Sequence, residues 1–370
     1  MADPILDEVN AITQFFLYPQ AIEDEFFRNS PFTAYLRSHS MATFTGGSDM
    51  RFAFTYAPLI GGAYSQGETF NVTKPQTLTA AQFQPKFYYT NITEYLEQIR
   101  VINVGDAAKF SLVEADLKQA MNTISAIIAI ALHRDGQSAA RIRQLNGWNE
   151  AFNDGVNPDW TGNVWTTYGG QTRNGAIGAA LNSTPRWAGD AAGNAAPITY
   201  QLLEETYQDA TRGGVEPNLG VGNKRVYAGI KNRIQPAQRF NQERDPYFGV
   251  SGMRMNNAMI LKDDYFPSLR YGANNSLGNY LTSTFATPAT ITSASGLPTA
   301  GTTVTVGEVF NWFNTTKHVL YYAADPLFGF GFTGFKQEID NTRVAGQILA
   351  MVNHKCTAPW SGISIYGLSN

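Results

Sequence analysis

Cysteine is nearly absent from this chain of 370 residues, which contains a single one, Cys356. A lone cysteine excludes an intramolecular disulfide and any metal cluster built on several thiolates. Cys356 lies in the apolar stretch ILAMVNHKC, so we expect a reduced thiol in the hydrophobic core. Covalent cross-linking by cysteine is therefore not expected to stabilise the subunit.

Charge is also scarce, because Asp, Glu, Lys and Arg make up 15% of the chain against roughly a quarter in typical soluble proteins. A formal net charge of −3 argues against a dedicated nucleic-acid binder, although it allows passive contact with packaged nucleic acid. The 18 Tyr and 23 Phe of this weakly charged chain indicate aromatic surface used in contacts with partners. The opening residues MADPILDEVN carry acids where a secretory signal needs cations, so no signal peptide is expected.

Motifs for catalysis are missing or stand in the wrong context. No G-x-S-x-G and no P-loop occurs. Asp263-Asp264 fits a surface turn before Pro267 better than a metal site. The histidines, which show no metal-ligand spacing, are His39, His133, His318 and His354. We therefore expect no metal site and no enzyme.

The segment 329–334, GFGFTG, matches the dinucleotide-binding pattern G-x-G-x-x-G. No second βαβ half follows it, and no acidic residue ends a following strand to hold a ribose. An aromatic–glycine turn is the better interpretation, and no cofactor is expected.

Residues 43–100 predict a long two-stranded ribbon with no core of its own. The outgoing arm MRFAFTY alternates with period two, and the return arm QPKFYYTNITEYLEQ mixes aromatic and β-branched residues. A two-stranded ribbon is marginal alone in water, so we expect it to lie on a neighbouring copy of the chain. An ordinary hairpin in a compact β domain is the alternative. The expected contact residues at the glycine-rich tip are Gly61, Gly62, Tyr64, Gly67 and Lys74.

A long helix is predicted directly after the ribbon, over residues 111–135. Ser111 and Glu114 form a capping box, in which each side chain accepts from a backbone N–H of the first turn. Apolar residues then recur every three or four positions up to Leu132, and Gly136 is a natural residue to follow the helix. Acidic and basic residues within the segment argue against a membrane span.

The remaining chain predicts an α+β organisation. Residues 137–197 predict loops and short strands, and residues 198–266 alternate helix, strand, helix and strand. Residues 281–306 are either a flexible surface insertion or a hairpin at a rim. The stretch TRVAGQILAMVNHKC is either helical or a buried strand, and GISIYGL predicts a closing strand. One predicted helix carries a basic cluster that fits a solvated face, an inter-subunit contact or, less well, phosphate binding: Lys224, Arg225, Lys231 and Arg233.

The order of these pieces resembles the major capsid proteins of tailed bacteriophages, whose fold is shared with encapsulin shells. The resemblance runs from about Phe26 to Tyr366 and lies in the order of the pieces more than in short motifs. The two ribbon arms are similar to the extended E-loop of this family, and the helix 111–135 is similar to its spine helix. The segments QLLEETYQD and NKRVYAGIKNRI resemble helices of its axial domain.

The resemblance implies a division of the chain into an N-terminal arm (1–41), an E-loop (42–104), a peripheral domain (105–197), an axial domain (198–330) and a return to the peripheral domain (331–370). It implies self-assembly into pentamers and hexamers of an icosahedral shell around a double-stranded DNA genome. Scaffold, portal and decoration proteins are its implied partners, with non-specific contact to packaged DNA and no membrane. The implied location is the virion, assembled in the host cytoplasm.

The chain departs from some relatives in starting directly at an arm, without a long extension that acts as an internal scaffold. We expect scaffolding to come from another protein or to be dispensable. No self-cross-linking chemistry is implied, since Lys74 fits an ordinary exposed lysine. The alternatives are an encapsulin-like compartment with an enzyme cargo, a nucleotide-dependent enzyme using residues 329–334, and another virion structural protein.

Overall fold

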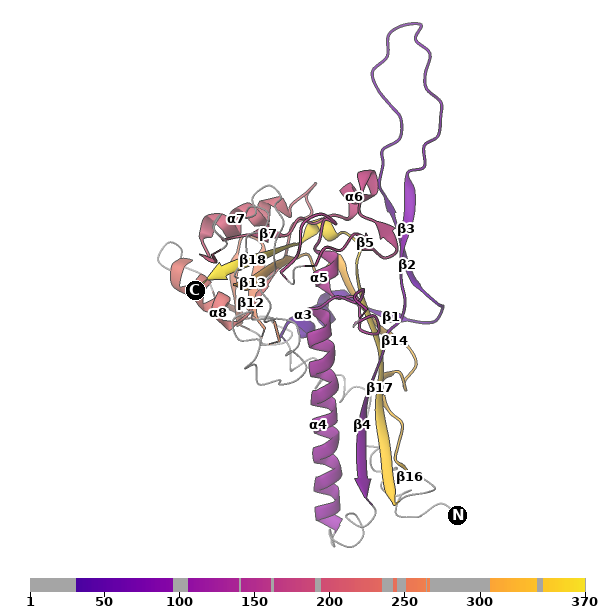
Figure 1. The fold of residues 1–370 in the computed structure, drawn as a ribbon, viewed down its shortest axis with the longest axis vertical. Coiled ribbons are helices and arrows are strands. Elements are labelled where there is room, and N and C mark those ends of the chain that lie inside the picture. Colours follow the sequence, from indigo (N-terminus) through magenta and orange to yellow (C-terminus); the bar gives the residue numbers. More distant parts are fainter. Residues whose placement is uncertain are drawn as a thin grey trace.

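The computed structural model describes residues 31–95, 106–139, 141–160, 163–189, 194–234, 242–244, 251–263, 265–266, 307–337 and 342–369. Within them the chain is α+β, with two mixed sheets, a long helix and a projecting hairpin (Figure 1). Most of the predicted N-terminal arm, and the predicted insertion 281–306, lie outside the described residues.

The first sheet is built around one long strand, β17 (Arg343–Cys356), which settles the helix-or-strand alternative for this segment. β4 (Phe87–Tyr95) pairs antiparallel with β17 over nine residues. The other strands of this sheet are β1 (Met41–Phe44), β14 (His318–Ala323), β15 (Gly329–Phe332) and β16 (Lys336–Gln337). The long helix α4 (Asp106–Leu132) lies along β4 (Figure 1), so alternate β4 residues such as Tyr88 and Ile92 are buried.

The second sheet has eight strands and packs on helices on one face. Its members are β7 (Arg186–Trp187), β8 (Ala196–Pro197), β9 (Leu219–Gly222), β10 (Gln242–Arg244), β11 (Ser251–Met255), β12 (Ala258–Lys262), β13 (Glu308–Phe313) and β18 (Ile363–Ser369). Helices α7 (Tyr200–Asp209) and α8 (Lys224–Ile234) bury Leu203 and Ile230 against Phe310 and Trp312 of β13. The predicted helix–strand–helix–strand order of this region is confirmed.

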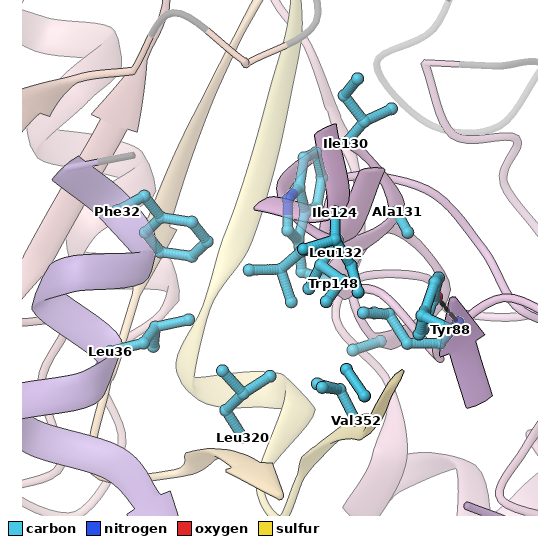
Figure 2. Packing of buried hydrophobic residues seen from close by; sticks show 14 of the residues in the cluster. Phe32, Leu36, Tyr88, Ile124, Ile130, Ala131, Leu132, Trp148, Leu320 and Val352 are labelled. Atoms are coloured by element: carbon cyan, nitrogen blue, oxygen red, sulfur yellow. Dashed lines mark hydrogen bonds between the residues drawn. The ribbon is translucent and has the colours of Figure 1, made fainter. Parts of the chain in front are cut away.

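The core where the two sheets meet is aromatic. Trp148 of the short helix α5 (Trp148–Ala151) stacks on Phe266 at 5.6 Å and meets Phe313 edge-on at 5.9 Å. Figure 2 shows side chains from several elements converging on this interior: Phe32 and Leu36 of α3 (Pro31–Ser40), Leu132 of α4, Leu320 of β14 and Val352 of β17. The region therefore ties the long helix to both sheets.

The long helix differs from its predicted bounds at both ends. It begins at Asp106, five residues before the predicted capping box, because a helix-favouring stretch, DAAKF, precedes Ser111. It ends at Leu132, where the N–H groups of His133 and Arg134 bond carbonyls three residues back and tighten the last turn. The backbone of Gly147 packs on these terminal carbonyls so closely that a Cβ would lie 2.1 Å from the Arg134 oxygen.

The predicted ribbon pairing is wrong in one respect. β2 (Met50–Thr55) pairs with β3 (Leu78–Phe83), while the predicted return arm forms β4 and joins β17 instead. The long β17 offers β4 more backbone partners than the six-residue β2 could, and α4 covers its apolar face. The hairpin also has a small core at its root, where Phe83 contacts the ring of Tyr168 at 5.1 Å.

The hairpin root rests on a second, very short hairpin, β5 (Thr167–Tyr168) and β6 (Gln171–Thr172). Gln82 N–H donates to the Gly169 carbonyl at 2.9 Å, and the Gln171 amide donates to the Ala80 carbonyl at 2.8 Å. The helix α6 (Gly175–Leu181) and the 3₁₀ turn η3 (Pro359–Ser361) flank this region. The direction of the projecting hairpin is thus fixed by the main body of the subunit.

Replacing Gly169 by Ala is expected to destabilise the subunit by about 2–4 kcal/mol. Gly169 has φ +55°, and a Cβ there would lie 2.7 Å from the Ala81 Cβ. Gly170→Ala is the matched control, because its φ of +77° is equally strained but nothing lies within 4 Å of its Cβ. Urea unfolding of both variants measures the difference, and equal losses would contradict a steric role for Gly169.

Candidate subunit-contact surfaces

The projecting hairpin ends in an extended loop, residues 56–77, that lies clear of the rest of the subunit (Figure 1). Tyr56 N–H donates to the Thr77 carbonyl at 3.0 Å and closes the base of the loop. Beyond that bond the loop exposes large apolar side chains, with Tyr64, Phe70 and Val72 at 67%, 65% and 92% exposure. An exposed apolar segment of this length marks a contact surface for another molecule.

All five predicted tip residues lie in this loop and are exposed. Gly67 adopts φ +88° in a turn, in which the Ser65 carbonyl accepts from Glu68 N–H at 3.0 Å. The Tyr64 ring meets Phe70 edge-on at 5.0 Å, so the tip has some local order. Sequence reasoning missed Phe70 and Val72, although their alternation in FNV was the signal for an exposed extended segment.

A second exposed apolar surface lies on the outward face of β4, opposite α4. Phe87 and Tyr89 are 62% and 65% exposed, and Phe87 meets Phe328 edge-on at 5.9 Å. A shallow groove of about 240 Å³ runs between them, and its lining also includes Gln347 and Leu349 of β17. We call this surface the β4 groove. Its lining contains no ionisable carboxylate, amine or imidazole, so apolar contact is the chemistry it offers.

A buried polar network holds these surfaces in place. Arg173 donates to the carbonyls of Glu150, Ala151, Asn153 and Leu181, and its guanidinium lies 4.9 Å from the Tyr168 ring centre. Burial raises the pKa of Glu150 to about 7, and Glu150 accepts from Gly136 N–H at 3.0 Å. The network thus connects the end of α4, α5 and the support of the hairpin root.

The one cysteine belongs to a buried chain of hydrogen bonds. His354 Nδ1 lies 2.8 Å from the Asn146 carbonyl, which can only accept, so His354 Nε2 accepts from His318 Nδ1 at 3.0 Å. His318 Nε2 is then left to accept from the Cys356 thiol at 3.5 Å. Cys356 is buried and free, as predicted, and burial raises the pKa of its thiol. A buried thiol of this kind is inert rather than nucleophilic.

The other candidate chemical sites serve packing. Residues 329–332 form β15, which pairs antiparallel with β17, so the strand–turn–helix arrangement of a dinucleotide site does not form there. A Cβ at Gly331 would lie 2.4 Å from the Pro326 carbonyl oxygen. Asp263 is buried rather than on the surface, since it accepts from Phe32 N–H at 3.2 Å and joins α3 to the sheet. No three His, Cys, Asp or Glu side chains gather as a metal site among the described residues.

None of the described helices is both long enough and apolar enough to cross a membrane. The described part of the chain has two exposed apolar surfaces, the loop 56–77 and the β4 groove.

Comparison with known proteins identifies the fold of the chain. No protein-family model and no curated protein matches the sequence. Among solved structures, the capsid of cyanophage A-1(L) matches with a TM-score of 0.58 at 11% identity, over 91% of this chain and 93% of that chain. The capsid of a native GTA particle matches with a TM-score of 0.54 at 8% identity, over 91% and 90%.

A third match is the holo-SrpI encapsulin complex of Synechococcus elongatus PCC 7942, with a TM-score of 0.50 at 7% identity over 91% of this chain and 87% of that chain. All three matches cover 91% of this chain. The chain therefore has the fold that these phage capsid, GTA capsid and encapsulin chains share.

Proposed function

We propose that this protein is the major capsid protein of a tailed bacteriophage, which assembles through pentamers and hexamers into an icosahedral shell around double-stranded DNA. The observation that carries the proposal is the loop 56–77, an exposed apolar arm that the described part of its own subunit does not cover. A capsid fold over 91% of the chain supports the same function. The role is structural, and no catalytic step is required of any residue.

In this proposal the loop 56–77 is the tip of an E-loop and α4 is the spine helix. The proposed domains of the chain are the N-terminal arm 1–41, the E-loop 42–104, the peripheral domain 105–197 and 331–370, and the axial domain 198–330. The E-loop of one copy lies over its neighbour, and Gly61, Gly62, Tyr64, Gly67 and Lys74 make the contact together with Phe70 and Val72. The apolar β4 groove is the surface best suited to receive it.

The mechanism of assembly is geometric. Each loop contact adds a modest apolar area, and a closed lattice repeats it at every subunit, so that no subunit leaves without breaking several contacts at once. The rigid support of the hairpin root, through Gly169 and Gln171, keeps the arm extended before the partner arrives. Scaffold, portal and decoration proteins are further partners, and packaged DNA touches the shell without sequence recognition.

Expression of the chain, sedimentation and electron microscopy test the proposal. Closed shells or six-membered and five-membered rings are the expected result. A protein that stays monomeric both alone and with the neighbouring scaffold product of its own genome would overturn it.

An encapsulin-like compartment is the second candidate, favoured by the match to an encapsulin at a TM-score of 0.50. The contents of native particles separate the two. Nuclease-protected DNA supports a virion assembled in the host cytoplasm, whereas a co-purified cargo enzyme supports a compartment.

Introducing a charge into the β4 groove is expected to reduce shell yield about tenfold, because an aspartate in an apolar contact loses its hydration without gaining a partner. Phe87→Asp places the charge in the groove on an outward, exposed position. Thr93→Asp is the matched control on the same exposed face of β4, outside the groove lining. Shell yield is measured by sedimentation; equal yields from the two variants would remove the groove from the assembly contact.

A further inference from the structure

Charges of opposite sign are separated onto two neighbouring helices, α7 and α8. The acids of α7 are Glu204, Glu205 and Asp209, and the helix has no basic residue. The bases of α8 are Lys224, Arg225, Lys231 and Arg233, and the helix has no acidic residue. A solvated helix usually interleaves both signs, which lets its own side chains pair three or four residues apart. Neither helix can do so.

Both helices present their charges outward from the same face of the eight-stranded sheet. α7 buries Leu203 and Tyr207, and α8 buries Val226 and Ile230, in one apolar cluster. The charged residues occupy the other sides of the helices, and Glu205, Asp209, Lys231 and Arg233 are all exposed. Figure 1 shows α7 and α8 at the side of the molecule away from the projecting hairpin and α4. This surface is therefore separate from the loop 56–77 and the β4 groove.

The two helices do not neutralise each other within the subunit. Glu205 pairs with Arg186 of β7 at 3.7 Å, with both side chains about half exposed. Asp209, Lys231 and Arg233 form no ion pair with any residue in the described part of the chain. Glu204 accepts from the neutral amides of Gln208 and Asn256. Three exposed charges thus stay available to a partner.

The position of Asp209 is also electrostatically unfavourable for its own helix. It is the last residue of α7, where the partial negative charge of the helix terminus disfavours an acid. Lys231 and Arg233, in the last turn of α8, have the favourable sign. The electrostatics of α7 alone do not explain an acid at this position, whereas a contact with a cationic partner does.

We propose that the acidic face of α7 docks on the basic face of α8 in a second copy of this chain, head to tail, around a ring. The inference rests on the proposed shell function and adds the contact that closes its rings. Because the two faces differ, the contact is heterologous, and repeated rotation of the same contact generates a closed ring. The complementary signs favour this register over contacts that bring two α7 or two α8 faces together.

Two charge-reversal variants test the proposal. Variant A carries Glu205→Lys and Asp209→Lys, so both of its faces are basic. Variant B carries Lys231→Glu and Arg233→Glu, so the last turn of its α8 is acidic, as its α7 already is. Each alone is expected to form rings at least tenfold less than the unmodified chain in native mass spectrometry, while circular dichroism and the unfolding temperature of the subunit confirm the fold.

Co-expression of A with B gives the decisive readout. In an alternating ring every contact again joins an acidic face to a basic one, and alternation closes only with an even number of copies. Six-membered rings of three A and three B chains are therefore expected to return to within about twofold of the unmodified yield, while five-membered rings stay depleted. One chain that carries all four substitutions restores complementarity by itself and is expected to form both ring sizes.

The matched control replaces Arg143 and Lys336, which are exposed elsewhere, by Glu and so changes the net charge as variant B does. Its mixture with variant A is expected to give no alternating rings. Rings from A or B alone at unmodified yield, or no alternating rings from their mixture, would overturn the docking of α7 on α8 while leaving the shell function intact. An unmodified chain that forms no ring even with its scaffold product overturns the shell function itself, and this inference with it.

Discussion

Deleting residues 61–74 is expected to leave a folded subunit that no longer forms shells. The deleted residues are all exposed, and none of them reaches the core. The hydrogen bond between Tyr56 and Thr77 that closes the base of the loop lies outside the deletion. A shorter loop between the same strands also costs less closure entropy. The unfolding temperature of the subunit should therefore stay within about 2 °C of the full chain, or rise slightly.

Assembly should respond very differently, because the loop carries the apolar side chains that the subunit itself does not bury. We expect the yield of sedimenting particles to fall by at least about a hundredfold, the effect of losing some 3 kcal/mol per contact. In a length-matched control, Tyr64, Phe70 and Val72 are replaced by Ser. This variant keeps the length of the loop and removes only its large apolar side chains, so it separates the effect of apolar contact from that of loop length. Shells at the normal yield from the deletion would show that the loop is not the assembly arm.

The long helix could be predicted from sequence because its signals are local. Apolar residues at three- and four-residue spacing and the following Gly136 act over one or two turns, and they predicted its existence. Its start was missed because a capping box at Ser111 is the strongest local signal, whereas the helix continues back to Asp106. Such ends are decided by the surrounding structure more than by propensity.

The pairing of the strands could not be predicted, because it depends on partners far along the chain. The predicted return arm begins at Gln84, whereas the strand that pairs with β2 is residues 78–83, and nothing local distinguishes the two. Gly346 and its neighbours on β17, more than 250 residues further on, take β4 as their partner. His318 and His354 are likewise brought together only by the antiparallel register of β14 and β17. The candidate contact loop, in contrast, was visible from its glycines, Gly61, Gly62 and Gly67.

Lowering the pH from 7 to 5 is expected to destabilise the unassembled subunit by about 2–3 kcal/mol. Three of its histidines are buried and uncharged. Burial lowers the pKa of His133 to about 3 and of His354 to about 4, and burial next to His354 lowers the pKa of His318 well below its usual range. In the unfolded chain all three return to an ordinary pKa of about 6.5.

Since the folded-state pKa values are the lower ones, the unfolded chain binds more protons below pH 6.5, and acid pulls the equilibrium toward it. At pH 5 each histidine costs about 2 kcal/mol relative to neutral pH. Glu150 works in the opposite sense, because burial raises its folded pKa to about 7 and the folded state gains a proton first. It returns about 2 kcal/mol over the same interval. Burial and the neighbouring Asp116 raise the pKa of Glu94 to about 7 as well, and this group, which is less deeply buried than Glu150, returns a smaller amount, so the net loss is about 2–3 kcal/mol. Below about pH 4.5 Glu150 no longer adds to the free energy of unfolding as the pH falls. The buried His133 and His318 continue to lower it.

The slope of stability against pH identifies the source of this loss independently of its absolute size. His133 lies among Phe32, Trp148 and Phe266, with ring centres 5.6, 5.8 and 5.0 Å away, so His133→Phe fits the same aromatic site. The variant loses the bond from Trp148 Nε1 to His133 Nδ1 at every pH, which lowers the whole curve. Its loss between pH 7 and 5 should nevertheless be smaller than that of the unmodified chain by about 2 kcal/mol. Urea unfolding at pH 7, 6 and 5 measures both curves, and parallel curves would mean that His133 has the same pKa in the folded subunit as in the unfolded chain.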